Sequence, residues 1–330
     1  MLKTKDIRQT LKNIEEYLLD EYKEMQEEQK RDWRTYEQQL TGRIKNALRN
    51  LRPLIEESVS AIAVSRERGR TPELTLQQKV TLLLMKQLFT RSNRNMSSML
   101  AAFSLLSDID VSYKTVERLY SDPEVELALH NLHVLVLKKK GVKKIRGSGD
   151  GTGYALSISK HYASEAQKRR DKAKTQPQRK KAFVYAFKML DIDSGLYICY
   201  GMSMKSEKRA FDSAMKMLKR LDVNVESMRL DRYYSFPSYV DRFGEARVYV
   251  IPRKNATVKG SWKWKRTMKR FVDDPLSYLE EYYQRNHSES GFSVDKRWFG
   301  WKVEQRRDDR IEVALACQNI WHNLFYLYKD

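Results

Sequence analysis

The chain has 330 residues, of which 32% are charged and 41% are hydrophobic, and its formal net charge at pH 7 is +20. This composition excludes an intrinsically disordered chain, and no apolar run approaches the ~20 residues that a membrane-spanning helix requires. Two cysteines, Cys199 and Cys317, are too few for a disulfide framework or a cysteine-based zinc site, which fits a reducing cytoplasm. The first ten residues, MLKTKDIRQT, are charged and contain no apolar stretch, so we expect no signal peptide.

Residues 1–65 are predicted to be helical, because apolar side chains recur there at helical spacing. One apolar stripe runs over Ile7–Leu18, and a second runs over Trp33–Leu48. Two arrangements fit this pattern, a helical hairpin that packs on itself and a coiled-coil dimerisation element. The hairpin is favoured because the heptad pattern is interrupted at residues 26–32.

A second group of helices is predicted after a polar break at residues 67–72. The predicted elements are a helix from Thr75 to Phe89, a helix over Ser97–Leu106, a turn over Ser107–Val111 and a helix over Tyr113–Tyr120. Thr75 and Ser112 have the hydroxyl side chains that commonly cap helices. The region up to residue 140 is therefore expected to be helical throughout.

The helix–turn–helix pattern at residues 97–120 has two interpretations. In one, the second helix enters a DNA groove and presents Tyr113, Lys114 and Arg118 to the DNA. In the other, the two helices form an ordinary corner with no ligand. The pattern alone does not choose between them.

From residue 141 the pattern changes to strands. Strands are predicted over Lys143–Gly149, Ala182–Leu190, Leu196–Met202, Val225–Leu230 and Arg247–Ile251, and helices over Ser206–Leu221, Phe236–Phe243, Pro275–Ser290 and Ile311–Tyr328. The turn Asp191–Gly195 makes the second and third strands a hairpin. Three strands followed by alternating helices and strands is the order of a ribonuclease H-like domain, whereas a doubly wound sheet would alternate from its start. We therefore expect an α+β or α/β chain, with a helical region over 1–140 and a ribonuclease H-like mixed-sheet domain over 141–330.

Three carboxylates stand out in the second region. Asp150 follows a predicted strand within the glycine-rich stretch Gly147–Gly153, Asp231 ends a second strand, and Glu289 lies in a late helix. The glycines would let a large anion approach the backbone. Three carboxylate ligands without His or Cys suit Mg²⁺ or Mn²⁺, and two such ions would support phosphoryl transfer. Taken singly, each carboxylate could also be a turn former or a helix cap.

The helix around Glu289 has an unusual face. Tyr282, Arg285, Glu289 and Lys296 fall within roughly 60° of one another at about 100° per residue. The two cations could grip phosphates beside the carboxylate, and Arg can do so bidentately. A solvated face of mixed charge is the alternative interpretation.

The same four residues form the pattern Tyr-x2-Arg-x3-Glu-x6-Lys, which resembles the signature of insertion-sequence DDE transposases. The Gly-Asp-Gly-Thr sequence at Asp150 and the Arg and aromatic pair after Asp231 resemble the other two motifs of this group, so the resemblance covers residues 143–330. It implies a ribonuclease H-like fold, a divalent metal and cut-and-paste DNA strand transfer. By this resemblance Asp150, Asp231 and Glu289 are catalytic and metal-binding, while Tyr282, Arg285 and Lys296 handle DNA ends.

Two basic segments fit a DNA partner, because most of the net charge lies in residues 141–330. Lys160–Lys181 is expected to follow the DNA backbone, and Arg253–Arg270 interleaves cations with tryptophans suited to base stacking. The candidate contacts are Lys168, Arg169, Arg170, Trp262, Trp264, Lys265 and Arg266. The alternative is that these two tryptophans lie in the core, where we also expect Trp298, Trp301 and Trp321.

Three functions remain open at this stage. The first is an active transposase that uses Mg²⁺ or Mn²⁺, binds double-stranded element ends and target DNA, acts as a homodimer and associates with a prokaryotic nucleoid rather than a membrane. The second is a catalytically silent DNA-binding relative, against which the complete set of carboxylates counts. The third is a metal-dependent nuclease without strand transfer, which would use the same carboxylates.

Overall fold

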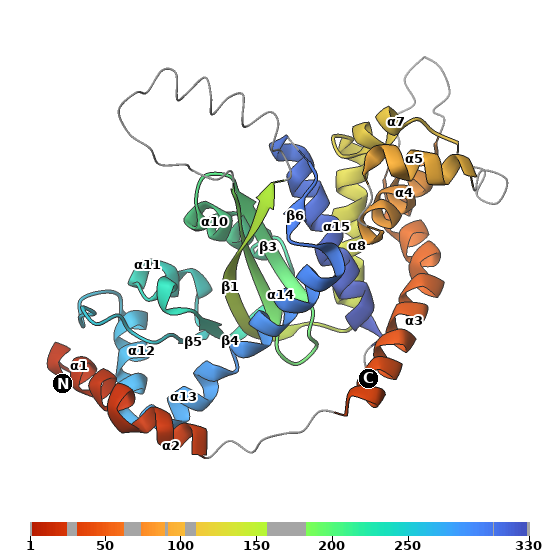
Figure 1. Ribbon diagram of the computed structural model, residues 1–330. Coiled ribbons are helices and arrows are strands. Elements are labelled where there is room, and N and C mark those ends of the chain that lie inside the picture. The colour runs from red at the N-terminus through yellow and green to blue at the C-terminus, as the bar shows by residue number, and fades with distance from the viewer. Residues whose placement is uncertain are drawn as a thin grey trace, which may run out of the picture.

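The computed structural model describes residues 2–24, 32–62, 74–89, 92–102, 110–156, 183–305 and 307–328, and the statements below concern these residues. Within them, a central mixed sheet separates two groups of helices (Figure 1). None of the described helices is long and apolar enough to cross a membrane.

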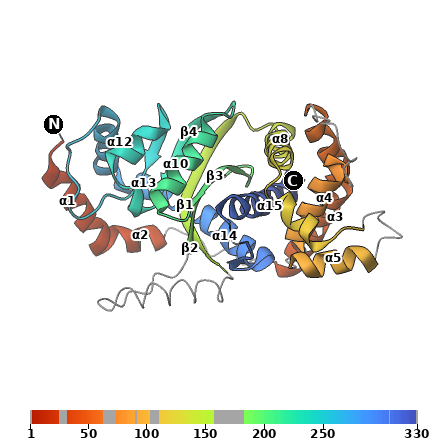
Figure 2. The same cartoon turned by 90° about the horizontal axis from the view of Figure 1, so that it is seen from above.

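The N-terminal helices do not form the expected hairpin. Helix α1 (Thr4–Asn13), a π-helical turn (Ile14–Leu18) and α2 (Leu19–Glu24) lie beside α12 and α13, whereas α3 (Trp33–Ser60) lies on the other side of the sheet (Figures 1 and 2). The stripe over Ile7–Leu18 is buried against the cluster that includes Trp264 and Met268. Pairing of the first helix with a distant part of the chain therefore replaces pairing with its sequence neighbour.

The second helical group consists of α3, α4 (Leu76–Leu88), α5 (Asn93–Ala102), α7 (Tyr113–Leu119) and α8 (Pro123–Lys139). The Thr75 hydroxyl accepts from the Gln78 N–H and the Ser112 hydroxyl accepts from the Thr115 N–H, which confirms both predicted caps. The expected turn over residues 107–111 falls mainly outside the described residues. Helix α8 lies within the region expected to be helical, but no separate helix was predicted over residues 123–139. It packs against α3 and α15 and is apolar on several faces, so its periodicity is weak.

The sheet contains β1 (Lys144–Leu156), β2 (Phe183–Asp191), β3 (Tyr197–Ser203), β4 (Asn224–Leu230), β5 (Arg247–Tyr249) and β6 (Lys302–Val303). The strand order is β3-β2-β1-β4-β5, with β6 paired to β1. The β1–β2 and β2–β3 pairs are antiparallel, and the β1–β4 and β4–β5 pairs are parallel. The hairpin and the predicted strands are therefore confirmed, and apart from β1 their bounds agree within a few residues.

Strand β1 is longer than the sequence predicts. It was expected to end at Gly149, but it continues through Asp150 to Leu156, because β2 stays paired with it along this whole stretch. Its parallel partner β4 is already finished at Leu230, which pairs with Gly149. Asp150 is therefore the first β1 residue beyond the end of β4.

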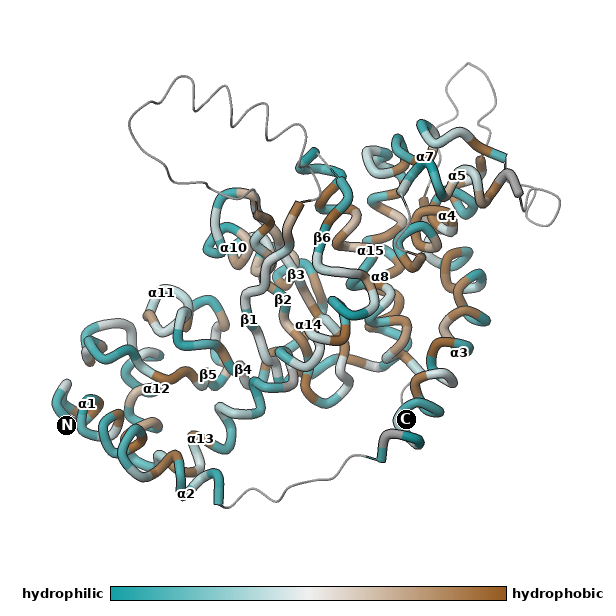
Figure 3. The backbone as a smooth tube through the Cα atoms, in the orientation of Figure 1, coloured by the Kyte–Doolittle hydropathy of each residue, from teal (hydrophilic) through white to brown (hydrophobic). Residues whose placement is uncertain are grey.

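The remaining helices cover the two faces of the sheet. They are α10 (Glu207–Leu218), the 3₁₀ turn Arg232–Tyr234, α11 (Pro237–Val240), the 3₁₀ turn Asp241–Phe243, α12 (Trp262–Asp273), α13 (Pro275–Tyr283), α14 (Asn286–Phe299) and α15 (Asp308–Leu327). Alternate residues of β2 point to opposite faces, so Phe187 packs with Phe211 of α10 while Lys188 faces Asp295 of α14. Strands β2 and β3 and helix α8 are largely brown in Figure 3, where hydrophobic residues fill the two large cores.

Candidate active site

Asp150 and Asp231 are neighbours because they follow the same pair of parallel strands. Asp231 comes directly after the last residue of β4, where its carboxylate accepts from the Tyr233 N–H at 3.1 Å. Asp150 lies on β1 at the next register position, with its Oδ1 accepting from the Gly151 N–H at 2.7 Å. The end of β4 thus brings the two carboxylates to one edge of the sheet.

The glycines beside Asp150 have a role that differs from the expected one. A Cβ at Gly149 would collide with Phe187 and Met228, and a Cβ at Gly151 would collide with Glu207. These glycines admit neighbouring protein side chains on the α10 face of β1. They therefore leave no open backbone there for a large anion.

The helix that carries Glu289 is broken. The predicted helix Pro275–Ser290 is two helices, α13 and α14, with a corner at residues 284–285. The Ser148 hydroxyl of β1 donates to the Arg285 carbonyl at 3.0 Å and contacts the Ser288 hydroxyl, also at 3.0 Å. Ser148 is fully buried and two residues from Asp150 on the same strand face. It fixes the corner over the sheet edge.

Arg285 lies at the centre of the three carboxylates. Its Nη1 is 3.1 Å from Asp150 Oδ2, 3.7 Å from Asp231 Oδ1 and 2.8 Å from Glu289 Oε1. The structure therefore brings the three predicted acidic residues together around a single guanidinium nitrogen. The Glu289 side chain is 51% exposed and that of Asp150 only 17%, so the cluster opens to solvent on the Glu289 side.

In this arrangement the guanidinium itself fills the space between the carboxylates. Among the described residues, no three or more His, Cys, Asp or Glu side chains are grouped closely enough to hold a metal ion. The carboxylates instead share a positive charge supplied by the protein. Burial raises the pKa of Asp150 to about 6, and the charges of Asp231 and Glu289 add to this shift, while Arg285 opposes it.

This raised pKa predicts that the stability of the folded protein depends on pH. Between pH 4 and pH 6 the unfolded chain releases the Asp150 proton and the folded chain retains it. The free energy of unfolding therefore falls by up to about 3 kcal/mol as the pH rises through this range. Without metal or DNA, Asp150→Asn is therefore expected to be more stable than the wild type at pH 8 and equally stable near pH 4. Urea unfolding at both pH values measures the difference.

The buried His133 ring also makes the stability depend on pH, but it does so equally in both proteins. Burial lowers the pKa of His133 to about 4, so its contribution to stability is lost as pH falls from 6.5 to 4, opposite in sign to that of Asp150. Both chains contain His133, so its contribution cancels in the difference. If Asp150→Asn and the wild type differ in stability by the same amount at pH 8 and at pH 4, the destabilisation assigned to the ionised Asp150 is wrong.

The two other residues of the predicted helix face, Tyr282 and Lys296, differ in how deeply they are buried. Tyr282 lies in the last turn of α13 and is 5% exposed, with its ring 5.7 Å from the Arg285 guanidinium, and burial raises the pKa of Tyr282 to about 12. It supports Arg285 from within the core rather than presenting a surface to DNA. Lys296 of α14 is half-buried between the Tyr154 and Trp301 rings, at 5.6 and 4.7 Å, and burial and Lys188 lower the pKa of Lys296.

The tryptophans differ from the expected distribution. Trp264 is 2% exposed and donates from Nε1 to the Thr257 carbonyl at 2.8 Å, so the core alternative holds for Trp264, which has no free face for stacking. Trp262 is 75% exposed, with the Lys265 ammonium 5.6 Å from its ring. Trp301 is 65% exposed, so its predicted core position is wrong, whereas Trp321 is buried as expected.

The other candidate contacts lie on surfaces or outside the described residues. Lys265 and Arg266 are exposed on α12, and Tyr113, Lys114 and Arg118 are exposed on α7, where Arg94 lies over the Tyr113 ring at 5.3 Å. Lys168, Arg169 and Arg170, with the whole segment 160–181, lie outside the described residues.

A buried charged cluster beneath α14 was missed. Asp295 accepts from Lys188 Nζ, from the Tyr197 hydroxyl and from His322 Nδ1, each at 2.8 Å, and these side chains are almost completely buried. The cluster joins β2, β3, α14 and α15. A lysine within the apolar stretch of β2 is the signal in the sequence that could have revealed it.

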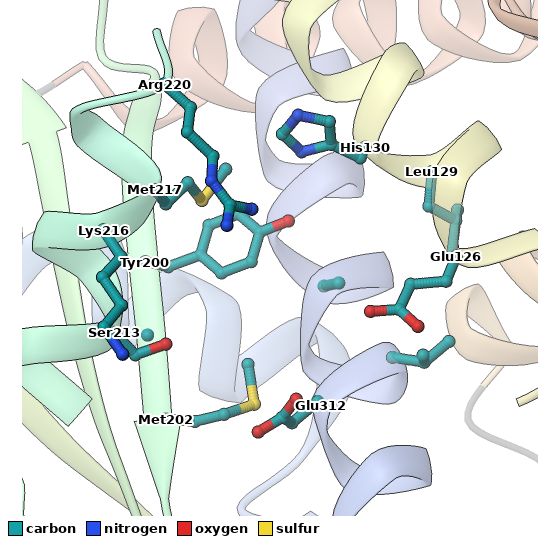
Figure 4. Close-up of a pocket in the computed structure, with 13 residues that line it drawn as sticks. Glu126, Leu129, His130, Tyr200, Met202, Ser213, Lys216, Met217, Arg220 and Glu312 are labelled. Carbon is teal, nitrogen blue, oxygen red and sulfur yellow. The ribbon is translucent and has the colours of Figure 1, made fainter. Parts of the chain in front are cut away.

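A cavity of about 340 Å³ lies elsewhere, between α8, β3, α10 and α15 (Figure 4). Lys216 and Arg220 of one wall face Glu126 and Glu312 of the other. None of the predicted site residues lines this cavity, and its mixed charge favours neither anions nor cations. The carboxylate cluster is therefore a separate site at the surface.

Comparisons with known proteins give one informative result. No protein-family model matches the chain, and no solved structure matches it. Over 284 residues the chain is 45% identical to the probable transposase for insertion sequence element ISA1214 of Archaeoglobus fulgidus, which covers 86% of this chain and 84% of that protein. Identity at this level over most of both chains shows that the chain belongs to the family of insertion-sequence transposases.

Proposed function

We propose that the chain is a DDE transposase that binds the ends of an insertion sequence and catalyses metal-dependent DNA strand cleavage and strand transfer. One observation carries the proposal. Carboxylates from β1, from the end of β4 and from α14 converge on the Nη1 atom of Arg285, although they are far apart in the sequence.

A ribonuclease H-like fold is part of this proposal. The sheet order β3-β2-β1-β4-β5, with an antiparallel half and a parallel half, supports it. In such a sheet the end of the central pair of parallel strands is the place where two carboxylates meet. Asp150 and Asp231 occupy this place.

The donor set suits Mg²⁺ or Mn²⁺. Three carboxylates that gather around one positively charged atom offer hard oxygen ligands without imidazole or thiolate. Asp150, Asp231 and Glu289 would hold the ions, which supply activation of the attacking oxygen and stabilisation of the leaving oxygen. Ser148 would keep the α13–α14 corner over the sheet edge, and Glu289 would complete the ligand set from the solvent side.

The proposed DNA-contacting surface includes the exposed side chains Trp262, Lys265 and Arg266 of α12 and Tyr113, Lys114 and Arg118 of α7. Lys296 lies seven residues beyond Glu289 on the same helix and would contact a phosphate near the cut. Cations of this kind bind the DNA backbone in a salt-dependent way. Homodimer formation on DNA and association with the nucleoid remain predictions.

The test is a cleavage and strand-transfer assay with the full chain. A labelled duplex that carries the terminal repeats of the source element is incubated with Mg²⁺, Mn²⁺ or EDTA, beside a duplex of the same composition in scrambled order. Metal-dependent cutting at the repeat ends, followed by joining to a target plasmid, is expected. Binding without cutting under either metal would favour a silent DNA-binding relative, and cutting without joining would favour a nuclease.

A further inference from the structure

Arg285 occupies the position in which a shared metal ion would be expected. Among the described residues, the ion pairs of Asp150, Asp231 and Glu289 are all made with Arg285. A guanidinium and a divalent cation cannot share this space, because both are positive and both need the same carboxylate oxygens.

The arginine side chain is poorly fixed apart from these contacts. Its Nε is buried and has no hydrogen-bond partner, and its guanidinium otherwise faces the Tyr282 ring. Its backbone, in contrast, is held by the Ser148 hydroxyl at 3.0 Å. The side chain can therefore leave the carboxylates without disturbing the corner between α13 and α14.

We propose that Arg285 is the resident counter-cation of the DNA-free protein, and that a DNA phosphate draws it off the carboxylates so that the metal ions can bind. The inference rests on the proposed function and concerns the control of that same site. In the DNA-free state Arg285 neutralises three converging carboxylates and keeps them in place. A bound phosphate offers the guanidinium an alternative bidentate partner, so DNA binding and metal binding become mutually favourable.

The test measures Mn²⁺ binding to DNA-free protein at pH 8, by electron paramagnetic resonance of the free ion. Arg285→Ala is expected to bind Mn²⁺ about tenfold or more tightly than the wild type, a typical coupling between two ligands. Arg253→Ala is the matched control. Arg253 donates to the Tyr233 carbonyl at 2.9 Å, close to Asp231, and forms no ion pair with the three carboxylates. It should leave Mn²⁺ affinity unchanged.

A second arm needs no variant. A saturating short duplex is expected to tighten Mn²⁺ binding to the wild type by a factor similar to that of Arg285→Ala, and to have little further effect on Arg285→Ala itself. The Mn²⁺ bound by the duplex alone is subtracted. Glu289→Gln with and without duplex shows how much of the remaining binding belongs to the cluster.

The outcomes separate this inference from the proposed function. If Arg285→Ala binds Mn²⁺ no more tightly than the wild type, or if Arg253→Ala gains as much, Arg285 is not a competing cation. If the duplex leaves Mn²⁺ affinity of the wild type unchanged, the coupling to DNA fails. If, with saturating duplex, Glu289→Gln and Asp231→Asn bind Mn²⁺ as the wild type does, the cluster is not a metal site and the proposed function fails with it.

Discussion

Replacement of Glu289 by Gln is expected to lower metal-dependent DNA cleavage about a thousandfold or more, because loss of a charged ligand removes several kcal/mol of metal-assisted stabilisation. The amide has nearly the size of the carboxylate, and the Glu289 side chain is 51% exposed, so the fold should not change. DNA affinity should stay the same or rise slightly, because one negative charge that repels phosphate is removed.

Glu280→Gln is the matched control for this substitution. Glu280 is an exposed glutamate on α13, one helix away, and forms no ion pair with Arg285. Its variant should cleave as the wild type does. Single-turnover cleavage of an end-bearing duplex, with DNA binding measured in EDTA, gives both quantities. A Glu289→Gln protein that cleaves within a few-fold of the Glu280→Gln protein would remove Glu289 from the catalytic set.

The sequence was sufficient to place the three carboxylates because each follows a local signal. Asp150 lies in the glycine-rich stretch Gly147–Gly153, Asp231 directly follows the short strand Val225–Leu230, and Glu289 lies at a fixed spacing from Arg285. Strand order then determines that the two aspartates meet. The hairpin turn at Asp191–Gly195 is similarly local, with the Gly195 N–H donating to the Asp191 carbonyl at 2.8 Å.

The details that could not be predicted depend on distant parts of the chain. No proline or glycine marks the helix break at Gln284. Contacts from β1 hold it instead, because Ser148 donates to the Arg285 carbonyl and Arg146 donates to the Gln284 side chain. Tyr282 was expected on one helix face with Arg285 and Glu289, but it is 5% exposed because it packs into the core that α13 covers. The exposure of Trp301 and the burial of Trp264 likewise depend on which segments pack against them, and periodicity does not reveal this.

The extent of β1 and the position of α1 have the same origin. A strand continues as long as either neighbour pairs with it, and β2 stays paired with β1 beyond Asp150. Residues 2–24 were assigned to the helical region that ends at residue 140, but their apolar stripe packs into the same core as Trp264 and Phe271. An amphipathic pattern predicts that a helix has a partner without indicating which partner it has.

Replacement of Lys188 by Met is expected to lower the free energy of unfolding by about 3 kcal/mol, at the low end of the cost of breaking a buried ion pair. Lys188 and Asp295 are 1% and 2% exposed, so removal of the ammonium leaves a carboxylate without its main counter-charge. The remaining contacts to Asp295 from Tyr197 and His322 are the reason for choosing the low end.

Further variants test whether the stability lost in Lys188→Met arises from the unpaired Asp295 carboxylate. Lys144→Met makes the same chemical change at an exposed lysine of β1, paired with Glu226 at 3.3 Å, and should cost less than about 1 kcal/mol. The double variant Lys188→Met with Asp295→Asn removes both charges of the ion pair. It should recover part of the stability that Lys188→Met loses, since no unpaired buried carboxylate remains. Urea unfolding of the wild type, of the single variants Lys188→Met, Asp295→Asn and Lys144→Met, and of the double variant measures this. A double variant that loses the sum of the two single losses would show that Lys188 stabilises the chain by packing alone. A non-additive result would instead show that the cost of Lys188→Met arises from leaving the buried Asp295 carboxylate without its counter-charge.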